Sequence, residues 1–326
     1  MKQLNFAIIG AGDMARFMAE TVNQMDHVRA YAVGSRSQDR AAAFAAKYSF
    51  DRAYGSYEEL LADPAVDLVY IALPHSHHAQ LMERCIDHKK PILCEKAFTV
   101  NAGQARRVLA RAEENGVFTA EAIWPRYMPM ADTLKEFAAS GRIGRITGAA
   151  ANLAYPVYAR ERLHRLDLAG GALLDVGIYP LTFAAILFGS QVESVFSEAQ
   201  ISPDGVDAQN TVVLTYPGGI RVTLYSSIVN TSDRLGAIYG TEGYALVGNV
   251  NNFEYLDIYN KEHVLVEHIQ RPPQLTGYEY EIDACIQAMD RGALECPQMP
   301  HSEIIRMMEL MDRIREQWNL VYPCEA

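Results

Sequence analysis

A glycine-rich segment near the N-terminus has the residue types and spacing to bind a phosphate-containing ligand. It reads Gly10-Ala-Gly12-Asp13-Met14-Ala15, directly after a short apolar run and before a helical pattern. Two glycines permit a tight turn whose backbone N–H groups approach a pyrophosphate, and the helix N-terminus adds partial positive charge. Small Ala15 lets the helix pack on the strand. The segment predicts a dinucleotide-binding turn, and the alternative is a purely structural glycine turn.

The end of the second apolar run discriminates between two dinucleotides. An acidic residue there would accept hydrogen bonds from the ribose 2′-hydroxyl of NAD. The chain instead carries Ser35-Arg36-Ser37, with Arg40 one helical turn later. An arginine can pair with the 2′-phosphate of NADP, and serine hydroxyls can hydrogen-bond that phosphate. We therefore expect NADP rather than NAD; the alternatives are an arginine solvated at a strand end and Asp39 as a weak acidic competitor.

Two further segments carry groups suited to proton transfer. Glu95-Lys96 ends a short apolar run, and ligands of parallel sheets bind beyond such strand ends. A lysine there can hydrogen-bond a substrate hydroxyl and a nicotinamide ribose, and its charge stabilises an alkoxide. In Gly170–Tyr179, Asp175 and Tyr179 stand four residues apart, on one face of a helix. The alternative interpretations are that Glu95-Lys96 is a surface ion pair and that Tyr179 is an ordinary packing residue.

The elements that must position these residues alternate regularly over the first 122 residues. Strand-like apolar runs alternate with helical patterns, and Ser56-Tyr-Glu-Glu59 has the sequence of a helix-capping box. Repeated β-α units of this length predict a doubly wound parallel sheet, an α/β fold with helices on both faces. The predicted strands are Leu4–Ile9, Val28–Val33, Val66–Leu73, Pro91–Cys94 and Val117–Ala122, and the predicted helices are 14–25, 39–47, 76–88 and 102–115.

The pattern changes after Trp124. Runs of β-branched and aromatic residues follow one another without intervening helices, and Tyr216-Pro-Gly-Gly219 marks a hairpin turn. These features predict an α+β domain with a large open-faced mixed or antiparallel sheet. We therefore expect residues 1–122 to bind the dinucleotide and residues 123–326 to bind substrate and to dimerise. Helices are predicted at 129–140, 172–188, 278–291 and 302–318, and strands at 145–155, 193–201, 211–216, 220–228, 235–239 and 244–248.

Composition excludes several other classes of function. The 326 residues carry 29 Lys and Arg against 40 Asp and Glu, a net charge of −11, so we expect neither a nucleic-acid partner nor an anionic membrane. Five scattered cysteines without a Cys-x-x-Cys pair predict no disulfide framework, no metal site and a reducing cytoplasm. The apolar run before Gly10 is too short for a signal peptide or a membrane span.

Taken together, the glycine turn, Glu95-Lys96 and Gly170–Tyr179 resemble the Gfo/Idh/MocA oxidoreductases, over essentially the whole chain. That family comprises NAD(P)-dependent enzymes with a Rossmann domain and an α+β domain. Within it, Glu121–Pro129 together with Gly170–Tyr179 is most similar to the dimeric dihydrodiol dehydrogenases, also described as NADP-dependent D-xylose dehydrogenases.

This resemblance implies a role for each candidate. Lys96 and Tyr179 would be the catalytic pair, with Tyr179 where many relatives carry histidine, and Asp175 would bind substrate or orient Tyr179. Trp124 and Arg126 would lie on the substrate cleft, although domain packing explains Trp124 equally well. Cofactor contacts would come from Glu95 and from the segment Leu73, Pro74, His75 and His78 beside the nicotinamide, and the alternative for the histidines is that they are solvated loop residues. Most relatives have proline where this chain has Ala97, so either the preceding peptide is trans or its surroundings hold a cis bond that costs about 2.5–4 kcal/mol.

The expected function is an NADP-dependent oxidoreductase that transfers hydride between nicotinamide and a polyol, an aldose or a vicinal diol, without a metal. An open sheet face is a large apolar patch in a monomer, which predicts a homodimer. The alternative is an NADP(H)-binding sensor without turnover. Such a sensor needs none of Lys96, Asp175 and Tyr179, which disfavours it.

Overall fold

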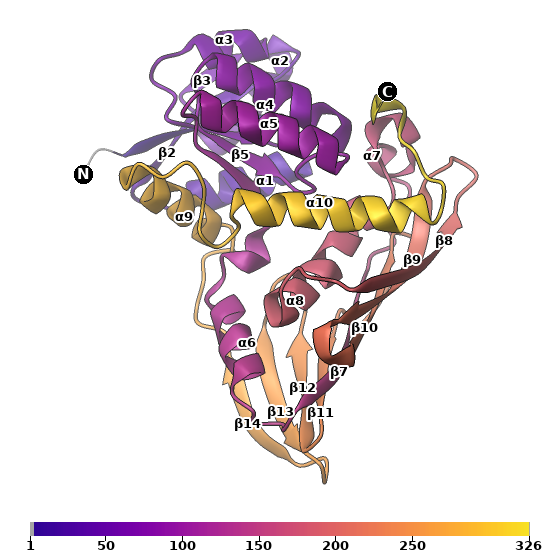
Figure 1. The fold of residues 1–326 in the computed structure, drawn as a ribbon. Helices are drawn as coiled ribbons and strands as arrows, with labels where there is room; N and C mark the ends of the chain where they lie inside the picture. Colours follow the sequence, from indigo (N-terminus) through magenta and orange to yellow (C-terminus); the bar gives the residue numbers. More distant parts are fainter. Residues whose placement is uncertain (1–2, 326) are drawn as a thin grey trace. The chain divides into compact units, whose positions relative to one another are not determined.

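The chain folds into two compact units. The computed structural model describes residues 3–325 (Figure 1). The first unit runs up to Ile123 and includes Gln274–Ile305, and the second contains Trp124–Pro273 and the residues from Arg306 onward. The chain passes from the first unit to the second next to the expected boundary at residue 122. It then returns to the first unit at Gln274, so the units are not separated by one boundary.

The first unit contains a six-stranded parallel sheet in the order β3-β2-β1-β4-β5-β6. This is the strand order of a doubly wound dinucleotide-binding sheet, and it confirms the predicted α/β fold. The three-residue strand β3 was not predicted, because its sequence Arg-Ala-Tyr contains no apolar run. The strands are β1 Leu4–Ile9, β2 Val28–Gly34, β3 Arg52–Tyr54, β4 Leu68–Ile71, β5 Ile92–Glu95 and β6 Thr119–Ala122.

Polar side chains cap three of the helices in this unit. Ser37, Ser56 and Asn101 each accept a hydrogen bond from the backbone N–H three residues later, which satisfies one otherwise unpaired helix donor. A 3-10 turn, η1 His75–His77, leads into α4. The helices are α1 Asp13–Val22, α2 Gln38–Tyr48, α3 Tyr57–Ala62, α4 His78–Asp87, α5 Ala102–Glu114 and α9 Glu279–Asp290.

Long-range hydrogen bonds attach the segment 274–305 to the first unit. The hydroxyls of Thr21 and Thr276 are 2.7 Å apart. The N–H of Thr119 donates to the carbonyl of Leu294 at 3.0 Å, and His301 Nε2 lies 2.9 Å from the carbonyl oxygen of Thr119. These partners are more than 170 residues apart in the chain, so no local sequence pattern could indicate that α9 joins this unit.

The second unit contains an eight-stranded mixed sheet in the order β14-β13-β12-β11-β7-β10-β9-β8, which confirms the predicted α+β architecture. Among the described strands of this sheet, only β7 and β10 pair in parallel, and the other neighbours are antiparallel. The strands β13 and β14 were not predicted; β14 is an exposed edge strand with little apolar periodicity, and β13 alternates between buried and partly exposed residues. The strands are β7 Ile146–Ala154, β8 Ser194–Ile201, β9 Asp207–Tyr216, β10 Ile220–Ser227, β11 Gly236–Gly240, β12 Gly243–Gly248, β13 Tyr255–Asn260 and β14 Leu265–Gln270.

Helix α8, Ile178–Phe188, covers one face of this sheet at β7 and β10, and α6, Pro129–Ala139, packs on α8. The helical stretch Leu166–Phe188 has the length and composition to cross a membrane, with a mean hydropathy of 1.8. However, 89% of its most apolar window is buried inside the protein, so the fold itself covers this surface. The remaining helices are α7 Glu161–His164 and α10 His301–Glu316.

Candidate active site

The turn between β1 and α1 has the backbone geometry that a pyrophosphate requires. Gly10 has a φ of +115°, and a Cβ there would lie 2.4 Å from the carbonyl oxygen of Ala72, so only glycine fits. Gly12 is the N-cap of α1, where no side chain caps the first N–H groups of the helix. A Cβ at Gly12 would meet nothing within 4 Å. Asp13 is exposed, Met14 is half-buried and Ala15 is fully buried. An open helix N-terminus beside a close-packed glycine fits the phosphate group of a dinucleotide.

Cationic side chains gather at the end of β2. Arg36 and Arg40 are both exposed, and Ser37 caps α2 by accepting the Arg40 N–H at 3.4 Å. Burial raises the pKa of Tyr57, and the nearby charges of Arg36, Arg40 and Arg84 oppose that rise. Ser35 is 7% exposed. Arg36 and Arg40 thus both lie close enough to Tyr57 for their charges to act on it.

The loop that carries Lys96 is held from both neighbouring strands. Glu95, the last residue of β5, accepts a hydrogen bond from the hydroxyl of Tyr70 on β4. Burial and the negative charge of Glu95 raise the pKa of Tyr70 well above its usual value, so the phenol stays a donor. On the other side, Glu121 of β6 accepts the Phe98 N–H at 2.9 Å. Lys96 and Glu95 are both buried. Sequence reasoning missed Tyr70 and Glu121, because each acts across the sheet.

His78 ties the loop after β4 to the loop after β5. Its Nε2 lies 2.8 Å from the Leu73 carbonyl oxygen, and its Nδ1 lies 2.9 Å from that of Ala97, which follows a cis peptide bond. His78 is 0% exposed, and burial lowers its pKa to about 4, against the opposing effect of these carbonyl groups. Its visible role is therefore to position the two loops. Leu73 and Pro74 keep accessible surface and His75 is buried, while cofactor contact by this segment stays a prediction.

In the second unit, Asp175 lies on a π-helical turn. The turn η4 spans Leu173–Gly177, and the N–H of Ile178 donates to the Leu173 carbonyl five residues earlier. Tyr179 follows in the first turn of α8, and Asp175 and Tyr179 are both buried. The sequence predicted a regular helix here. The wider turn is a distortion that occurs frequently at functional sites.

An unpredicted residue, Arg162, pairs with Asp175. Its Nη1 lies 2.7 Å from Asp175 Oδ1, and the Arg162 side chain is 36% exposed. Arg162 comes from the short helix α7, thirteen residues earlier, where no sequence signal distinguishes it from the other arginines of that segment. The pair places a compensating positive charge next to the carboxylate. Trp124 and Arg126 lie in the 3-10 turn η2, Trp124–Arg126, and both are buried.

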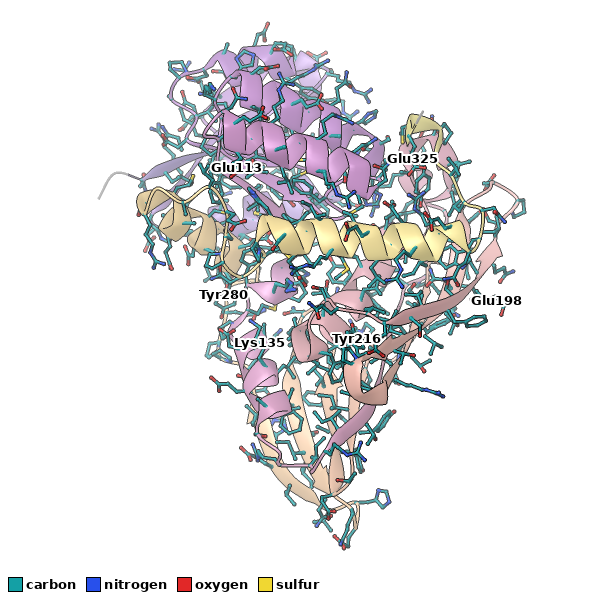
Figure 2. The ribbon with its side chains drawn as sticks, viewed as in Figure 1. Glu113, Lys135, Glu198, Tyr216, Tyr280 and Glu325 are labelled. Atoms are coloured by element: carbon teal, nitrogen blue, oxygen red, sulfur yellow. The ribbon has the colours of Figure 1, made fainter. Side chains whose placement is uncertain are left out.

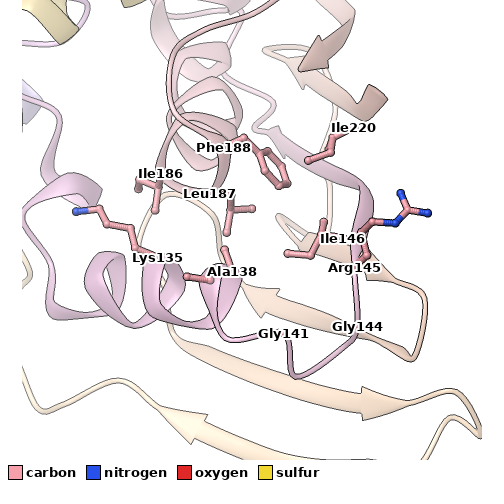
Figure 3. A pocket seen from close by; sticks show the side chains of 11 residues that line it. Lys135, Ala138, Gly141, Gly144, Arg145, Ile146, Ile186, Leu187, Phe188 and Ile220 are labelled. Atoms are coloured by element: carbon pink, nitrogen blue, oxygen red, sulfur yellow. The ribbon is translucent and has the colours of Figure 1, made fainter. Parts of the chain in front are cut away.

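The predicted residues do not line the cavity that is seen in the second unit (Figure 3). This cavity has a volume of about 450 Å³ and is formed by the C-terminal parts of α6 and α8, the turn 141–145, Ile146 of β7 and Ile220. Its lining is mostly apolar, with Lys135 and Arg145 as its cations. Among residues 3–325, no group of three or more His, Cys, Asp or Glu side chains is placed to hold a metal ion.

Comparisons with known proteins agree with this geometry. The family described as "Oxidoreductase family, NAD-binding Rossmann fold" matches residues 4–122, and the "GFO/IDH/MocA C-terminal domain" matches residues 131–246. The chain therefore belongs to the Gfo/Idh/MocA family of NAD(P)-binding oxidoreductases, as the sequence motifs predicted.

Individual relatives cover nearly the full chain. Trans-1,2-dihydrobenzene-1,2-diol dehydrogenase from Mus musculus is 31% identical over 98% of both chains. The Homo sapiens enzyme of the same name is 31% identical over 93% of this chain and 92% of its own. Among solved structures, a 3-ketoreductase from Actinomadura kijaniata in complex with NADP and TDP-benzene superposes with a TM-score of 0.89 and 25% identity, covering 97% of this chain and 98% of that one.

Proposed function

We propose that this protein is an NADP-dependent dehydrogenase or reductase that acts on a polyol, an aldose or a vicinal diol. The observation that carries the proposal is the buried Lys96 at the end of β5, in a loop that Tyr70 and Glu121 hold from both sides. A lysine is costly to bury without a function for its charge. The relatives named for dihydrodiol oxidation support the choice of substrate class.

In the proposed reaction a bound NADP would supply the hydride chemistry between its nicotinamide and the substrate carbon. The ammonium group of Lys96 hydrogen-bonds the substrate oxygen and stabilises negative charge there. Tyr179 takes the hydroxyl proton during oxidation and returns it during reduction. Asp175, balanced by Arg162, binds a second hydroxyl or orients Tyr179. Trp124 and Arg126 contact the remainder of the substrate.

The choice of NADP rests on the cations at the end of β2. Arg36 and Arg40 are exposed, and their charges act on the same neighbour, Tyr57. A dianionic 2′-phosphate is the part of NADP that NAD lacks, and an arginine can bind it with two parallel hydrogen bonds. The 3-ketoreductase that superposes on this chain was also solved with NADP.

A direct assay tests the function. The purified protein is incubated with NADP or NAD and a panel of trans-dihydrodiols, pentoses, hexoses and polyols, and absorbance at about 340 nm, the band of the reduced nicotinamide, is followed. We expect turnover with NADP and at least one substrate of the panel. NADP binding without turnover on any substrate, in either direction, would instead support the sensor alternative.

We also propose that the protein is a homodimer through the uncovered face of the second sheet. Directly paired residues of neighbouring strands lie on the same face, and Tyr239, Tyr244 and Tyr259 form such a row across β11, β12 and β13. The rings of Tyr244 and Tyr259 stack at 4.8 Å, and Tyr239 is 45% exposed. Aromatic residues are enriched in protein interfaces, which supports this face as the dimer contact. The cysteines among residues 3–325 form no disulfide bond, in keeping with a proposed cytoplasmic location.

A further inference from the structure

A buried carboxylate from the sheet holds the start of the π-helical turn that carries Asp175. Asp207, the first residue of β9, is 0% exposed, and its Oδ2 accepts the backbone N–H of Leu173 at 2.7 Å. Leu173 is the first residue of η4. Helix starts leave N–H groups without backbone partners, and here an aspartate 34 residues away in sequence supplies one acceptor.

The same carboxylate oxygen belongs to a buried chain of hydrogen bonds. Asn210 Nδ2 donates to Asp207 Oδ2 at 2.9 Å, and the Ser226 hydroxyl of β10 donates to Asn210 Oδ1 at 2.8 Å. Asn210 and Ser226 are buried too. Hydrogen bonds in such a dry environment are stronger than at a surface. The chain therefore links two sheet strands to the first residue of the π-helical turn.

Two glycines let the turn lie directly against this network. Gly171 has a φ of +115°, and a Cβ there would lie 2.1 Å from Asp207 Oδ1. A Cβ at Gly177 would lie 2.9 Å from the Ser226 hydroxyl oxygen. The backbone on both sides of Asp175 thus approaches the network more closely than any other residue type would allow.

The burial of Asp207 is only partly compensated. Its Oδ1 is buried and has no hydrogen-bond partner among the described residues. Burial raises the pKa of Asp207 to about 7, while hydrogen bonds from Leu173 and Asn210 and the charge of Arg315 oppose this. Arg315 is itself paired with Glu325, labelled in Figure 2, at 2.6 Å. A carboxyl group kept in so unfavourable a place, with both donors on one oxygen, indicates that its contact with Leu173 matters.

We infer that Asp207 is a positioning residue that fixes the π-helical turn and thereby the placement of Asp175 and Tyr179. This inference rests on the proposed function, in which those two residues act on the substrate. Misplacement of a reacting group by about 1 Å can cost about 100-fold in rate, so a single anchoring hydrogen bond is sufficient to matter.

Two substitutions at Asp207 test the inference. Asp207→Ala removes the acceptor, whereas Asp207→Asn keeps an amide oxygen for the Leu173 and Asn210 donors. Ser197→Ala is the control, because Ser197 lies on β8 of the same sheet and its hydroxyl donates to Gln317 and to the Ile314 carbonyl of α10 rather than to η4. The readouts are kcat, KM, NADPH affinity and hydrogen exchange of the Leu173 amide.

We expect Asp207→Ala to lower kcat and to raise Leu173 exchange by about 10-fold each, while NADPH affinity stays within about twofold of wild type. Asp207→Asn should recover both values to within about threefold of wild type, and Ser197→Ala should change neither. Equal kcat in Asp207→Ala and Ser197→Ala, or an Asp207→Asn enzyme no better than Asp207→Ala, would overturn the inference.

The outcomes separate this inference from the proposed function. A wild-type protein inactive on every diol and sugar refutes the function, and unchanged Leu173 exchange in Asp207→Ala independently refutes the positioning contact. Should Asp207→Ala fail to fold, Asn210→Leu removes the other donor to Asp207 and should raise Leu173 exchange by about threefold. Unchanged exchange in Asn210→Leu would then count against the inference.

Discussion

At the scale of single residues, Lys96 depends on side chains that are distant in sequence. Tyr70 holds the preceding Glu95, and Glu121 holds the Phe98 backbone two residues after the lysine. Both partners are buried, so neither bond competes with water. Lys96 therefore stands on a loop whose backbone is fixed on both sides, as its proposed electrostatic role requires.

Lys96→Met should impair chemistry rather than cofactor binding. Methionine keeps most of the aliphatic stem and removes the charge, so kcat should fall by about 10²–10⁴-fold. NADPH affinity is measured in parallel by fluorescence titration, and Lys47→Met on the exposed face of α2 serves as the control. Turnover within a few-fold of wild type, with normal NADPH binding, would show that Lys96 has another role.

Tyr179→Phe should remove most activity while NADP binding and the fold remain intact. The substitution deletes only the hydroxyl, so its effect belongs in turnover rather than in substrate affinity alone. Tyr179→His should restore part of the rate, because histidine is also an acid/base group. A phenylalanine variant with near-normal turnover and an unchanged pH profile would mean that the tyrosine only packs.

Arg36→Ala should weaken the binding of NADP far more than that of NAD. The loss of a charge-assisted contact to the 2′-phosphate costs about 1.5–3 kcal/mol, or roughly 10- to 100-fold in affinity. Arg29 of the same strand pairs with Asp51 and supplies the control, Arg29→Ala. Equal losses for both cofactors in isothermal titrations, or a wild-type preference for NAD, would contradict the assignment.

At the scale of elements, the loops after β4 and β5 share one buried histidine. The folded-state pKa of His78 is about 4, below the ordinary value of 6.5, so the unfolded chain binds a proton that the folded chain excludes. Stability from this group is therefore present above about pH 6.5 and is lost as the pH falls toward 4. By linkage the loss reaches about 2 kcal/mol at pH 5.

Replacement of His78 should flatten this dependence. We expect the unfolding free energy of wild type to fall more steeply between pH 7 and pH 5 than that of His78→Gln, measured by urea titration at each pH. His88→Gln, which changes the histidine that ends the same helix, should keep the wild-type slope. Parallel curves for wild type and His78→Gln would show that His78 does not titrate as its burial requires.

At the scale of the whole molecule, the aromatic row Tyr239, Tyr244 and Tyr259 determines the proposed assembly. Tyr239→Arg with Tyr259→Arg places like charges on this face and should convert a dimer of twice 36.3 kDa into a monomer of 36.3 kDa in sedimentation analysis. The control Phe17→Arg, at an exposed aromatic residue of α1, should leave the sedimentation mass at that of the dimer. A wild-type monomer, or a double variant that stays dimeric, would exclude this face as the interface.

Features that depend on neighbouring residues could be predicted from the sequence. The glycine turn after β1, the cap at Ser56, and the alternation of strands and helices each reflect backbone preferences over a few residues. The resemblance through Glu95-Lys96 and Gly170–Tyr179 identified the family, because these segments are contiguous in the chain. The sequence alone therefore determined the fold class, the dinucleotide turn and the candidate residues.

Only the tertiary structure decided how those residues are held. The return of segment 274–305 to the first unit, the pairing of Arg162 with Asp175, and the contact of Asp207 with Leu173 all join residues that are distant in sequence. Such contacts follow from the packing of whole elements, so they leave no periodicity in the sequence. The π-helical turn at Asp175 likewise depends on Gly171 and Gly177 meeting the sheet, because the space there is set by side chains of β9 and β10 rather than by helix propensity.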